Sequence, residues 1–359
     1  MPSARLLESI ASSNFSALLS SADEDVPSVE EAVRDDRWLA AMNDEYESLE
    51  RNKTWELVNL PPGRKAVSCM WLLKHKRDAH GNIVRFKARL VARGFTQVFG
   101  QDYLDTFAPV AKMSSFKVLL AISSALNLHL EHLDVKTAFL QGALEETIYM
   151  AQPPYFKCKG AEKKVCKLQK SIYGLKQSPR CWYQKLNETL SGCGMKRTHA
   201  DNCVYVLRRE GELAILVVWV DDMVLGCNSP SLSKEIKTKL AQKLDITDLG
   251  PLSYFLGMRV QQDSNGLKLS QQQYTEQLLK TFLMDQCKPI ATPMGSGKGF
   301  RLVKRAPTEA QCNQAVYRSA VGGLLYLCHT RPDKWELCAS TPAIHLMPIG
   351  LQSNGSSDT

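Results

Sequence analysis

Apolar and polar residues follow two different periods along the chain. An apolar residue recurs every three or four positions at Trp38, Met42, Tyr46 and Leu49, and this spacing predicts a helix with one apolar face. Similar patterns predict further helices at 115–127, 232–244, 273–284 and 316–329. Short apolar-rich runs predict strands at 55–58, 67–76, 83–92, 130–135, 147–150, 203–208, 213–220 and 223–226. Because helices and strands do not alternate regularly, the pattern favours an α+β fold with a largely antiparallel sheet.

Turn residues mark where several of these elements begin and end. Ser178 followed by Pro179 is a typical N-cap and first-turn pair, so we expect a helix there that Gly192 or Gly194 ends. Asn265 and Gly266 predict a tight hairpin turn between two more short strands, 254–261 and 267–270.

Three acidic residues stand where predicted strands end. Asp221 and Asp222 are the only residues between two apolar strands, so they fall at a tight hairpin turn. Asp134 lies near the end of the apolar-rich run 130–135. If these strands are neighbours, three carboxylates meet, and their repulsion requires a cation. A site whose ligands are all oxygen atoms favours magnesium. A solvated turn is the alternative, because turns favour aspartate.

Such a carboxylate cluster suits phosphoryl transfer. Two ions about 3.5–4 Å apart can activate an attacking hydroxyl and stabilise a leaving pyrophosphate, so few other catalytic side chains are needed. The chain has no Walker-type GxxxxGK[ST], HExxH or GxSxG motif, and residues 295–298 lack the Walker spacing. The sequence therefore disfavours P-loop and hydrolase functions.

Composition narrows the class of protein. Hydrophobic residues make up 44% of the 359 positions, enough for a folded core. The 11 cysteines are an odd number without a C-x-x-C pair, which argues against a disulfide framework and a zinc site. The longest purely apolar run, 213–220, is far shorter than the roughly 20 residues of a membrane-spanning helix. We therefore expect an intracellular protein with reduced thiols and no membrane span.

The net charge of +8 is unevenly distributed. Residues 1–50 carry 12 acidic and 3 basic side chains. Residues 64–117 carry 11 basic and 3 acidic side chains, and residues 157–197 carry 11 basic and 2 acidic ones. The two basic stretches either bind a polyanion, above all a phosphate backbone, or form a solvated surface, and charge alone leaves both open.

Several segments resemble copia-type reverse transcriptases, in the same order along the chain. The segment 133–142, LDVKTAFLQG, is similar to the family's first catalytic motif, and 220–223, VDDM, is similar to its catalytic hairpin. Further similar segments are 87–94, 106–110, 171–180 with Trp182, 248–250, 254–257 and 330–333. Together these motifs are highly specific, although each alone would not be.

The resemblance implies a right-hand polymerase fold over residues 35–333, with fingers, a palm with an antiparallel sheet and a partial thumb. It implies template-directed DNA synthesis from dNTPs by two-metal phosphoryl transfer, with two Mg²⁺ ions or with Mn²⁺ in their place. Asp134 and Asp221 are the expected principal metal ligands, and Asp222 is a more peripheral acid. The expected partners are an RNA template, a DNA primer or duplex and dNTPs. The expected location is a cytoplasmic virus-like particle or the nucleus.

By the same resemblance, the nucleotide pocket is formed by Lys87, Arg89, Phe139, Tyr173 and Gly174. Lys87 and Arg89 project from one face of a predicted strand and would contact the triphosphate, unless that face is merely solvated. Phe139 would be a steric gate against a ribose 2′-hydroxyl, or else an ordinary core residue. Gly174 would let the backbone approach a base pair closely.

Template and primer contacts are also implied. Gln177 and Arg180 would touch template or nucleotide, although a solvated residue at a helix start explains Arg180 equally well. The hairpin that holds the primer terminus corresponds to Tyr254, Phe255, Leu256 and Gly257. The alternative for its two aromatic residues is a place in the core of the hairpin. The two basic stretches would line a groove for an RNA–DNA or DNA duplex through backbone contacts.

The residue before the catalytic turn and the segment after residue 333 depart from the family pattern. Trp219 replaces a smaller aromatic residue before the catalytic turn. Residues 1–34 form an acidic lead-in that we expect to be flexible, and residues 334–359 are an aberrant tail, expected to be disordered and without an RNase H domain. Two alternatives therefore stay open: a truncated, catalytically inactive remnant that at most binds nucleic acid, and another two-metal enzyme such as a nucleotide cyclase.

Overall fold

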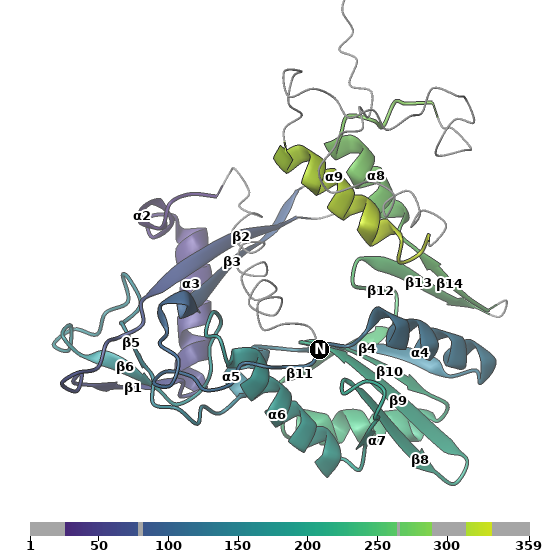
Figure 1. The fold of residues 1–359 in the computed structure, drawn as a ribbon, viewed down its shortest axis with the longest axis horizontal. Helices are drawn as coiled ribbons and strands as arrows, with labels where there is room; N and C mark the ends of the chain where they lie inside the picture. The colour runs from purple at the N-terminus through teal and green to yellow at the C-terminus, as the bar shows by residue number, and fades with distance from the viewer. Residues whose placement is uncertain (1–25, 78–81, 264–265, 289–313, 332–359) are drawn as a thin grey trace, which may run out of the picture. The chain divides into compact units, whose positions relative to one another are not determined.

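The computed structural model describes residues 26–77, 82–263, 266–288 and 314–331 (Figure 1). The chain divides into two compact units, Met1–Pro251 and Leu252–Thr359. Helices and strands are mixed, and neighbouring strands of each sheet pair antiparallel, which confirms the predicted α+β class. Across the described ranges, no helix has the length and apolarity needed to cross a bilayer.

The largest sheet of the first unit has six strands in the order β11-β4-β10-β9-β8-β7. Its strands are β4 (His129–Val135), β7 (Lys196–Arg197), β8 (Val204–Arg209), β9 (Glu212–Trp219), β10 (Asp222–Cys227) and β11 (Ile246–Pro251). The strand β4 comes from much earlier in the chain than β9 and β10. Its insertion beside β10 brings Asp134 next to the β9–β10 hairpin.

Two helices, α4 (Met113–Ala125) and α7 (Pro230–Ala241), cover this sheet. Gly226 of β10 has no side chain, and Leu119 of α4 and Leu130 of β4 lie close to the space where its Cβ would be. The next residue of β4, Glu131, instead accepts a hydrogen bond of 2.9 Å from Lys237 of α7. Because successive strand residues point to opposite faces, α4 and α7 cover opposite faces of the sheet.

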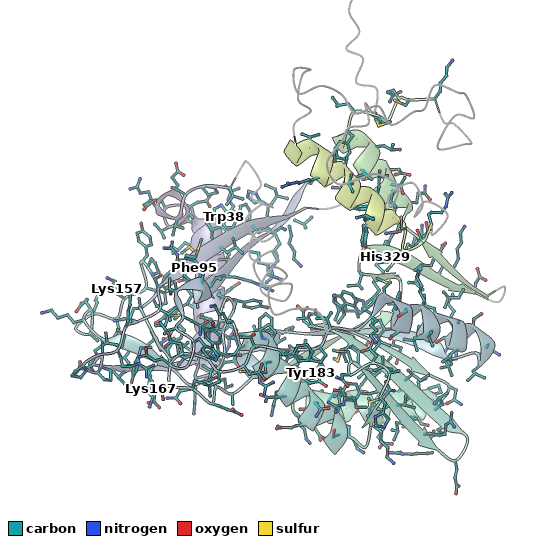
Figure 2. The ribbon with its side chains drawn as sticks, in the orientation of Figure 1. Trp38, Phe95, Lys157, Lys167, Tyr183 and His329 are labelled. Carbon is teal, nitrogen blue, oxygen red and sulfur yellow. The ribbon has the colours of Figure 1, made fainter. Side chains whose placement is uncertain are left out.

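A hairpin and a long helix build another part of the first unit. The strands β2 (Cys69–Arg77) and β3 (Ile83–Ala92) pair as predicted, and the apolar face of α3 (Asp36–Arg51) packs on this hairpin. Trp38 of α3 is buried and packs edge-on against Phe86, with 4.9 Å between ring centres (Figure 2).

A three-stranded sheet in the order β1-β6-β5 extends this core. Its strands are β1 (Trp55–Val58), β5 (Tyr149–Met150) and β6 (Val165–Leu168). Short helical turns, η1 (Gly94–Thr96) and α5 (Ala138–Gln141), follow β3 and β4.

The predicted flexible lead-in differs from the structure where it approaches α3. The helix α2 (Val29–Ala32) begins with a capping box between Ser28 and Glu31, and Ala32 is completely buried. Burial of this short helix in the core therefore orders the chain from Ser28. Residues 1–25 and the predicted tail 334–359 lie outside the described residues.

The helix α6 (Ser178–Gly192) begins one residue earlier than predicted. Its N-cap is Gln177, and Ser178 is the first helical residue, because the Ser178 hydroxyl donates to the backbone oxygen of Ile172. Gly194, with φ +86°, follows the helix end as expected for a residue after a helix.

The second unit combines a small sheet with two helices. The sheet order is β12-β13-β14, formed by β12 (Tyr254–Phe255), β13 (Met258–Asp263) and β14 (Gly266–Ser270), and the helices are α8 (Gln272–Thr281) and α9 (Gln314–Leu327). Asn265 of the predicted turn lies outside the described residues. Buried Gln271 donates to the backbone oxygen of Tyr326 at 3.1 Å, which fastens α9 to the start of α8.

Candidate active site

Strand register places two acidic residues side by side. Asp134 near the end of β4 and Asp222 at the start of β10 are direct antiparallel partners. Direct partners project from the same face with Cβ atoms about 4.5–5.5 Å apart. The predicted meeting of Asp134 with the 221–222 segment is therefore confirmed by the sheet topology, while the catalytic roles of these residues stay predictions.

The turn between β9 and β10 is shifted by one residue from the predicted one. Trp219 and Asp222 are partners, so Val220 and Asp221 form the two-residue turn. Val220 has φ +59°, in a left-handed region that β-branched residues rarely adopt. Its carbonyl oxygen accepts a hydrogen bond of 2.7 Å from Nε1 of the buried Trp182 in α6. This bond fastens a strained turn to α6, and such strain concentrates at functional sites.

The carboxylates Asp134, Asp221 and Asp222 line one cavity of about 870 Å³ in the first unit. The same cavity is lined by residues of α3, of the β2–β3 hairpin and of β11. The basic residues of the hairpin that line it are Lys76, Arg85, Lys87 and Arg89. A cavity lined by both acidic and basic side chains suits a ligand that has phosphate groups and bound metal ions.

Asp222 is engaged by a neighbouring histidine. Nε2 of His132 lies 3.1 Å from Oδ1 of Asp222, and because a carboxylate only accepts, the histidine donates. Within the described residues, no three His, Cys, Asp or Glu side chains stand close enough to hold a metal ion.

The charge of this acid cluster fits a divalent cation. Burial raises the pKa of Asp221, and the charges of Asp222 and Asp134 raise it further, whereas Arg89 lowers it. A cation between these oxygens would relieve the repulsion, and donor sets made only of oxygen suit magnesium and manganese. The residues present thus fit the predicted metal in donor chemistry and in charge.

Lys87 and Arg89 lie on the face of β3 that lines the cavity, as their spacing predicted. Burial, together with the like charges of neighbouring basic residues, lowers the pKa of Lys87 to about 8. The guanidinium of Arg89 lies 4.1 Å from the centre of the Tyr173 ring. Tyr173 in turn packs edge-on against Phe139, with 4.8 Å between ring centres. An aromatic pair therefore restrains Arg89 at the cavity wall.

Glu45 of α3 is a cavity residue that the sequence analysis did not identify. Its carboxylate accepts a hydrogen bond of 3.3 Å from the Leu90 backbone N–H, on the edge of β3 that no described strand covers. Burial raises the pKa of Glu45, and the charges of Arg89 and Lys87 oppose this effect. The sequence signal that could have identified Glu45 is its place as an acidic residue on the apolar face of the helix, beside Met42.

Three residues predicted to contact nucleotide or template instead contact other parts of the protein. Gly174 has φ +91°, and a Cβ there would overlap the backbone at the end of β3, so its close approach is to protein. Gln177 is 1% exposed and donates to the backbone oxygen of Asp102 at 2.8 Å. Arg180 forms an ion pair of 2.9 Å with Asp105. The structure therefore does not support direct ligand contacts by Gly174 or by the Gln177 side chain.

The predicted primer hairpin lies in the second unit. Tyr254 is 39% exposed, whereas Phe255 is buried, as the core alternative held. Leu256 and Gly257 form the turn with φ +49° and +73°, and the Tyr326 hydroxyl donates to the Leu256 carbonyl. Of the two aromatic residues in this hairpin, Tyr254 is the one accessible to a partner.

The two basic stretches differ in whether their basic residues line the large cavity. Four basic residues of 64–117 line the cavity, whereas none from 157–197 does in the part of the chain that the structure describes. The prediction that both stretches line one groove is therefore not supported for the second stretch.

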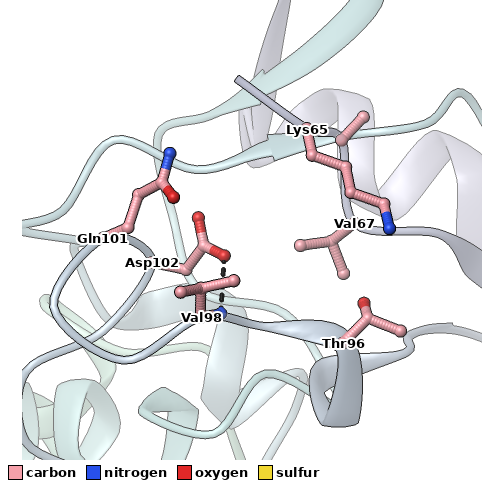
Figure 3. Close-up of a pocket in the computed structure, with 7 residues that line it drawn as sticks. Lys65, Val67, Thr96, Val98, Gln101 and Asp102 are labelled. Carbon is pink, nitrogen blue, oxygen red and sulfur yellow. Dashed lines mark hydrogen bonds between the residues drawn. The ribbon is translucent and has the colours of Figure 1, made fainter. Parts of the chain in front are cut away.

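A second, much smaller cavity of about 30 Å³ also lies in the first unit (Figure 3). Lys65, Thr96 and Gln101 are among its lining residues, and Asp102 accepts a hydrogen bond of 2.9 Å from the Val98 backbone N–H beside it. This volume admits about two or three waters, at about 10–15 Å³ each, and is too small for a nucleotide.

Comparison with known proteins agrees with the geometry of the larger cavity. A family model described as "Reverse transcriptase (RNA-dependent DNA polymerase)" matches residues 52–296. The chain belongs to the reverse transcriptase family. The matched range contains the three acids, the basic hairpin and Tyr173, whereas the α3 residues that line the same cavity precede this range.

The relatives of this reverse transcriptase are retrotransposon polyproteins. "Retrovirus-related Pol polyprotein from transposon TNT 1-94" of Nicotiana tabacum is 43% identical over 303 residues, which are 82% of this chain and 23% of that protein. The corresponding protein of transposon RE1 from Arabidopsis thaliana is 39% identical over 308 residues, 84% of this chain and 20% of the relative. The chain thus spans about a quarter or less of these relatives. The predicted resemblance to copia-type reverse transcriptases is confirmed.

Proposed function

We propose that the chain is an RNA-directed DNA polymerase that extends a DNA primer from dNTPs by two-metal phosphoryl transfer. The observation that carries this proposal is the single cavity on which three carboxylates and a basic hairpin face occur together. Phosphoryl transfer depends on positioning and charge neutralisation, for which acids bind cations and basic residues bind phosphate oxygens.

Asp134 and Asp221 are the proposed principal ligands of two Mg²⁺ ions, for which Mn²⁺ can substitute, and Asp222 is a peripheral ligand. Bound magnesium supplies Lewis acidity and neutralises charge on the attacking and leaving oxygens. The chain fixes the backbone beneath these acids. The Val135 N–H donates to the Asp221 carbonyl at 2.9 Å, and β4–β10 pairing holds Asp134 beside Asp222.

Lys87 and Arg89 are the proposed triphosphate-binding residues. Tyr173 restrains the planar guanidinium of Arg89, so less side-chain entropy is lost when it binds phosphate oxygens. A bound triphosphate would favour the charged form of Lys87, which burial disfavours. Phe139 is the proposed steric gate against a ribose 2′-hydroxyl, and it packs against Tyr173 of the cavity wall.

The elements can be assigned to the parts of the proposed right-hand polymerase. In this proposal the six-stranded sheet is the palm, because it carries the acids, and the β2–β3 hairpin with α3 forms the fingers. The second unit is a partial thumb, in which the exposed Tyr254 contacts the primer strand. The partners are then an RNA template, a DNA primer and dNTPs.

Primer extension by the full chain tests this proposal. With oligo-dT on poly-rA, dTTP and Mg²⁺, we expect template-dependent incorporation that Asp221→Asn lowers by at least about 100-fold, as for loss of a transition-state charge stabiliser. Asp245→Asn, a change at another acid of the same cavity, should leave the rate within a few-fold.

The other outcomes identify the alternatives. Wild-type incorporation no greater than that of Asp221→Asn would favour a catalytically inactive protein that only binds nucleic acid. Nucleotide turnover that needs no template would favour a different two-metal enzyme, such as a nucleotide cyclase.

A further inference from the structure

The loop that joins β5 to β6 carries four exposed lysines within eight residues. They are Lys157, Lys159, Lys163 and Lys164, and we call residues 157–164 the lysine loop. In the described structure, none of the four ammonium groups is in an ion pair with a carboxylate. A dense, unneutralised group of lysines is unfavourable by self-repulsion unless an anionic partner neutralises it.

The lysine loop is held in one shape by a buried amide. Gln152, only 7% exposed, donates to the backbone oxygens of Ala161 and Lys164 at 2.7 and 2.9 Å. Its Oε1 accepts a hydrogen bond of 2.9 Å from the Cys158 N–H. Three hydrogen bonds from one buried side chain fix both arms of the loop. The lysines are therefore presented by an ordered backbone, which reduces the entropy lost on binding.

The one acidic residue of the lysine loop is used within it. Glu162 accepts a hydrogen bond of 2.9 Å from the Gly160 N–H, and this bond is the main cause that lowers the pKa of Glu162. Its carboxylate therefore stabilises the Gly160 turn, where φ is +81°. Four positive charges remain against one negative charge on this loop.

A lysine of the adjoining sheet gives a contrast. Lys167 in β6 is the direct partner of Glu56 in β1, so an acid stands opposite it on the same face. The lysine loop lies beyond this sheet, at the outer edge of the first unit, where Lys157 is labelled (Figure 2). None of its residues lines the 870 Å³ cavity. The lysines of the loop therefore do not contact a nucleotide inside the cavity.

We infer that the lysine loop binds the phosphate backbone of RNA outside the catalytic cavity. The identity of the polyanion rests on the proposed function, because a template is a continuous chain of phosphates that must leave the cavity over the protein surface. Compact ammonium groups suit such sequence-independent phosphate contacts. This surface would hold the template during synthesis without taking part in the chemistry.

The salt dependence of RNA binding tests this inference. Fluorescence anisotropy of a labelled single-stranded RNA would be titrated with the full chain at several KCl concentrations. The logarithm of affinity falls with the logarithm of salt by about 0.7 per phosphate contact on single strands. The variant K157Q/K159Q/K163Q/K164Q should therefore have a slope smaller by about 2–3 and a roughly tenfold or greater loss of affinity at moderate salt.

A charge-matched control separates the loop from net charge. K196Q/R208Q/K234Q/K243Q removes four cations that are exposed on β7, β8, α7 and the segment after α7. We expect its slope to stay within about one contact of the wild-type slope. A wild-type slope in the loop variant, or an equal reduction in both variants, would overturn the inference.

Two further measurements identify the partner and separate this inference from the proposed function. Binding to phosphatidylserine vesicles that needs the four lysines, with RNA binding unchanged, would assign the loop to membranes and overturn the inference. The RNA titration contains no dNTP or metal, so its result does not depend on catalysis. A chain that fails in primer extension yet shows the predicted slope change would lose the proposed function and keep this surface.

Discussion

Two acids of the cavity have different electrostatic surroundings although they are adjacent in sequence. Asp222 accepts a hydrogen bond from His132, whereas burial and the nearby carboxylates raise the pKa of Asp221. The charge of Asp221 is therefore the one that a bound cation would stabilise more. This difference supports Asp221 as a principal ligand and Asp222 as a peripheral one.

Trp182→Phe should destabilise the turn that carries Asp221. The substitution keeps an aromatic ring but removes the Nε1–H that the Val220 carbonyl accepts. We expect the free energy of unfolding to fall by about 2–4 kcal/mol, from the lost hydrogen bond and the smaller ring. Denaturant unfolding of the full chain measures this loss. The control Trp219→Phe, at a partly buried position, should cost less than about 1.5 kcal/mol, and equal losses would contradict the role of the hydrogen bond.

Glu45→Gln should change how stability depends on pH. Burial raises the pKa of Glu45 in the folded chain, so the unfolded chain loses this proton first as the pH rises. The contribution of Glu45 to stability therefore decreases as the pH rises above about 4.3, the ordinary pKa of a glutamate. Glutamine keeps an oxygen for the Leu90 N–H and has no charge to bury.

We expect Glu45→Gln to be at least as stable as the wild type at neutral pH. Its unfolding free energy should also decline less between acidic and neutral pH. Urea midpoints at a series of pH values measure both effects. A variant that is less stable at neutral pH, with the wild-type pH dependence, would show that the charged form is required.

Helices and hairpins could be predicted from the sequence where the turn residues and the spacing of apolar residues indicated the same element. The β2–β3 and β9–β10 hairpins and the helix that contains Trp38 and Leu49 were predicted for this reason. Two errors at helix ends have local causes. The Ser178 hydroxyl donates to the Ile172 backbone oxygen instead of capping α6. Packing against the core orders α2, which was predicted to be flexible. The pairing of β4 with β11 on its other edge was not predictable, because non-local pairing leaves no local signal.

Gly174→Ala tests how the segment 171–177 fits against β3. A Cβ at Gly174 would overlap backbone atoms of Ala92, and φ +91° disfavours any other residue. We expect a loss of more than about 4 kcal/mol, or failure to fold. Gly211→Ala is the matched control, because φ is +72° but nothing lies within 4 Å. It should cost only about 1–2 kcal/mol, so similar losses at the two positions would contradict a steric origin.

At the scale of the whole molecule, the site depends on residues far apart in sequence. Asp134 and the 221–222 segment were predicted to meet because each follows an apolar strand, and motif order supported this. Glu45 was missed because its place on the cavity depends on α3 packing against β3, a contact between distant segments that no local pattern predicts. The burial of Gln177 was not foreseen, because an exposed and a buried amide look alike in sequence.

Manganese binding tests most directly whether distant carboxylates share divalent ions. Electron paramagnetic resonance would measure free Mn²⁺ during titration of the full chain. We expect Asp134→Asn and Asp221→Asn each to weaken binding by at least tenfold, about 1.4 kcal/mol, and Asp245→Asn to leave it within about twofold. Equal affinities in the wild type and in the Asp134 and Asp221 variants would contradict a shared metal site.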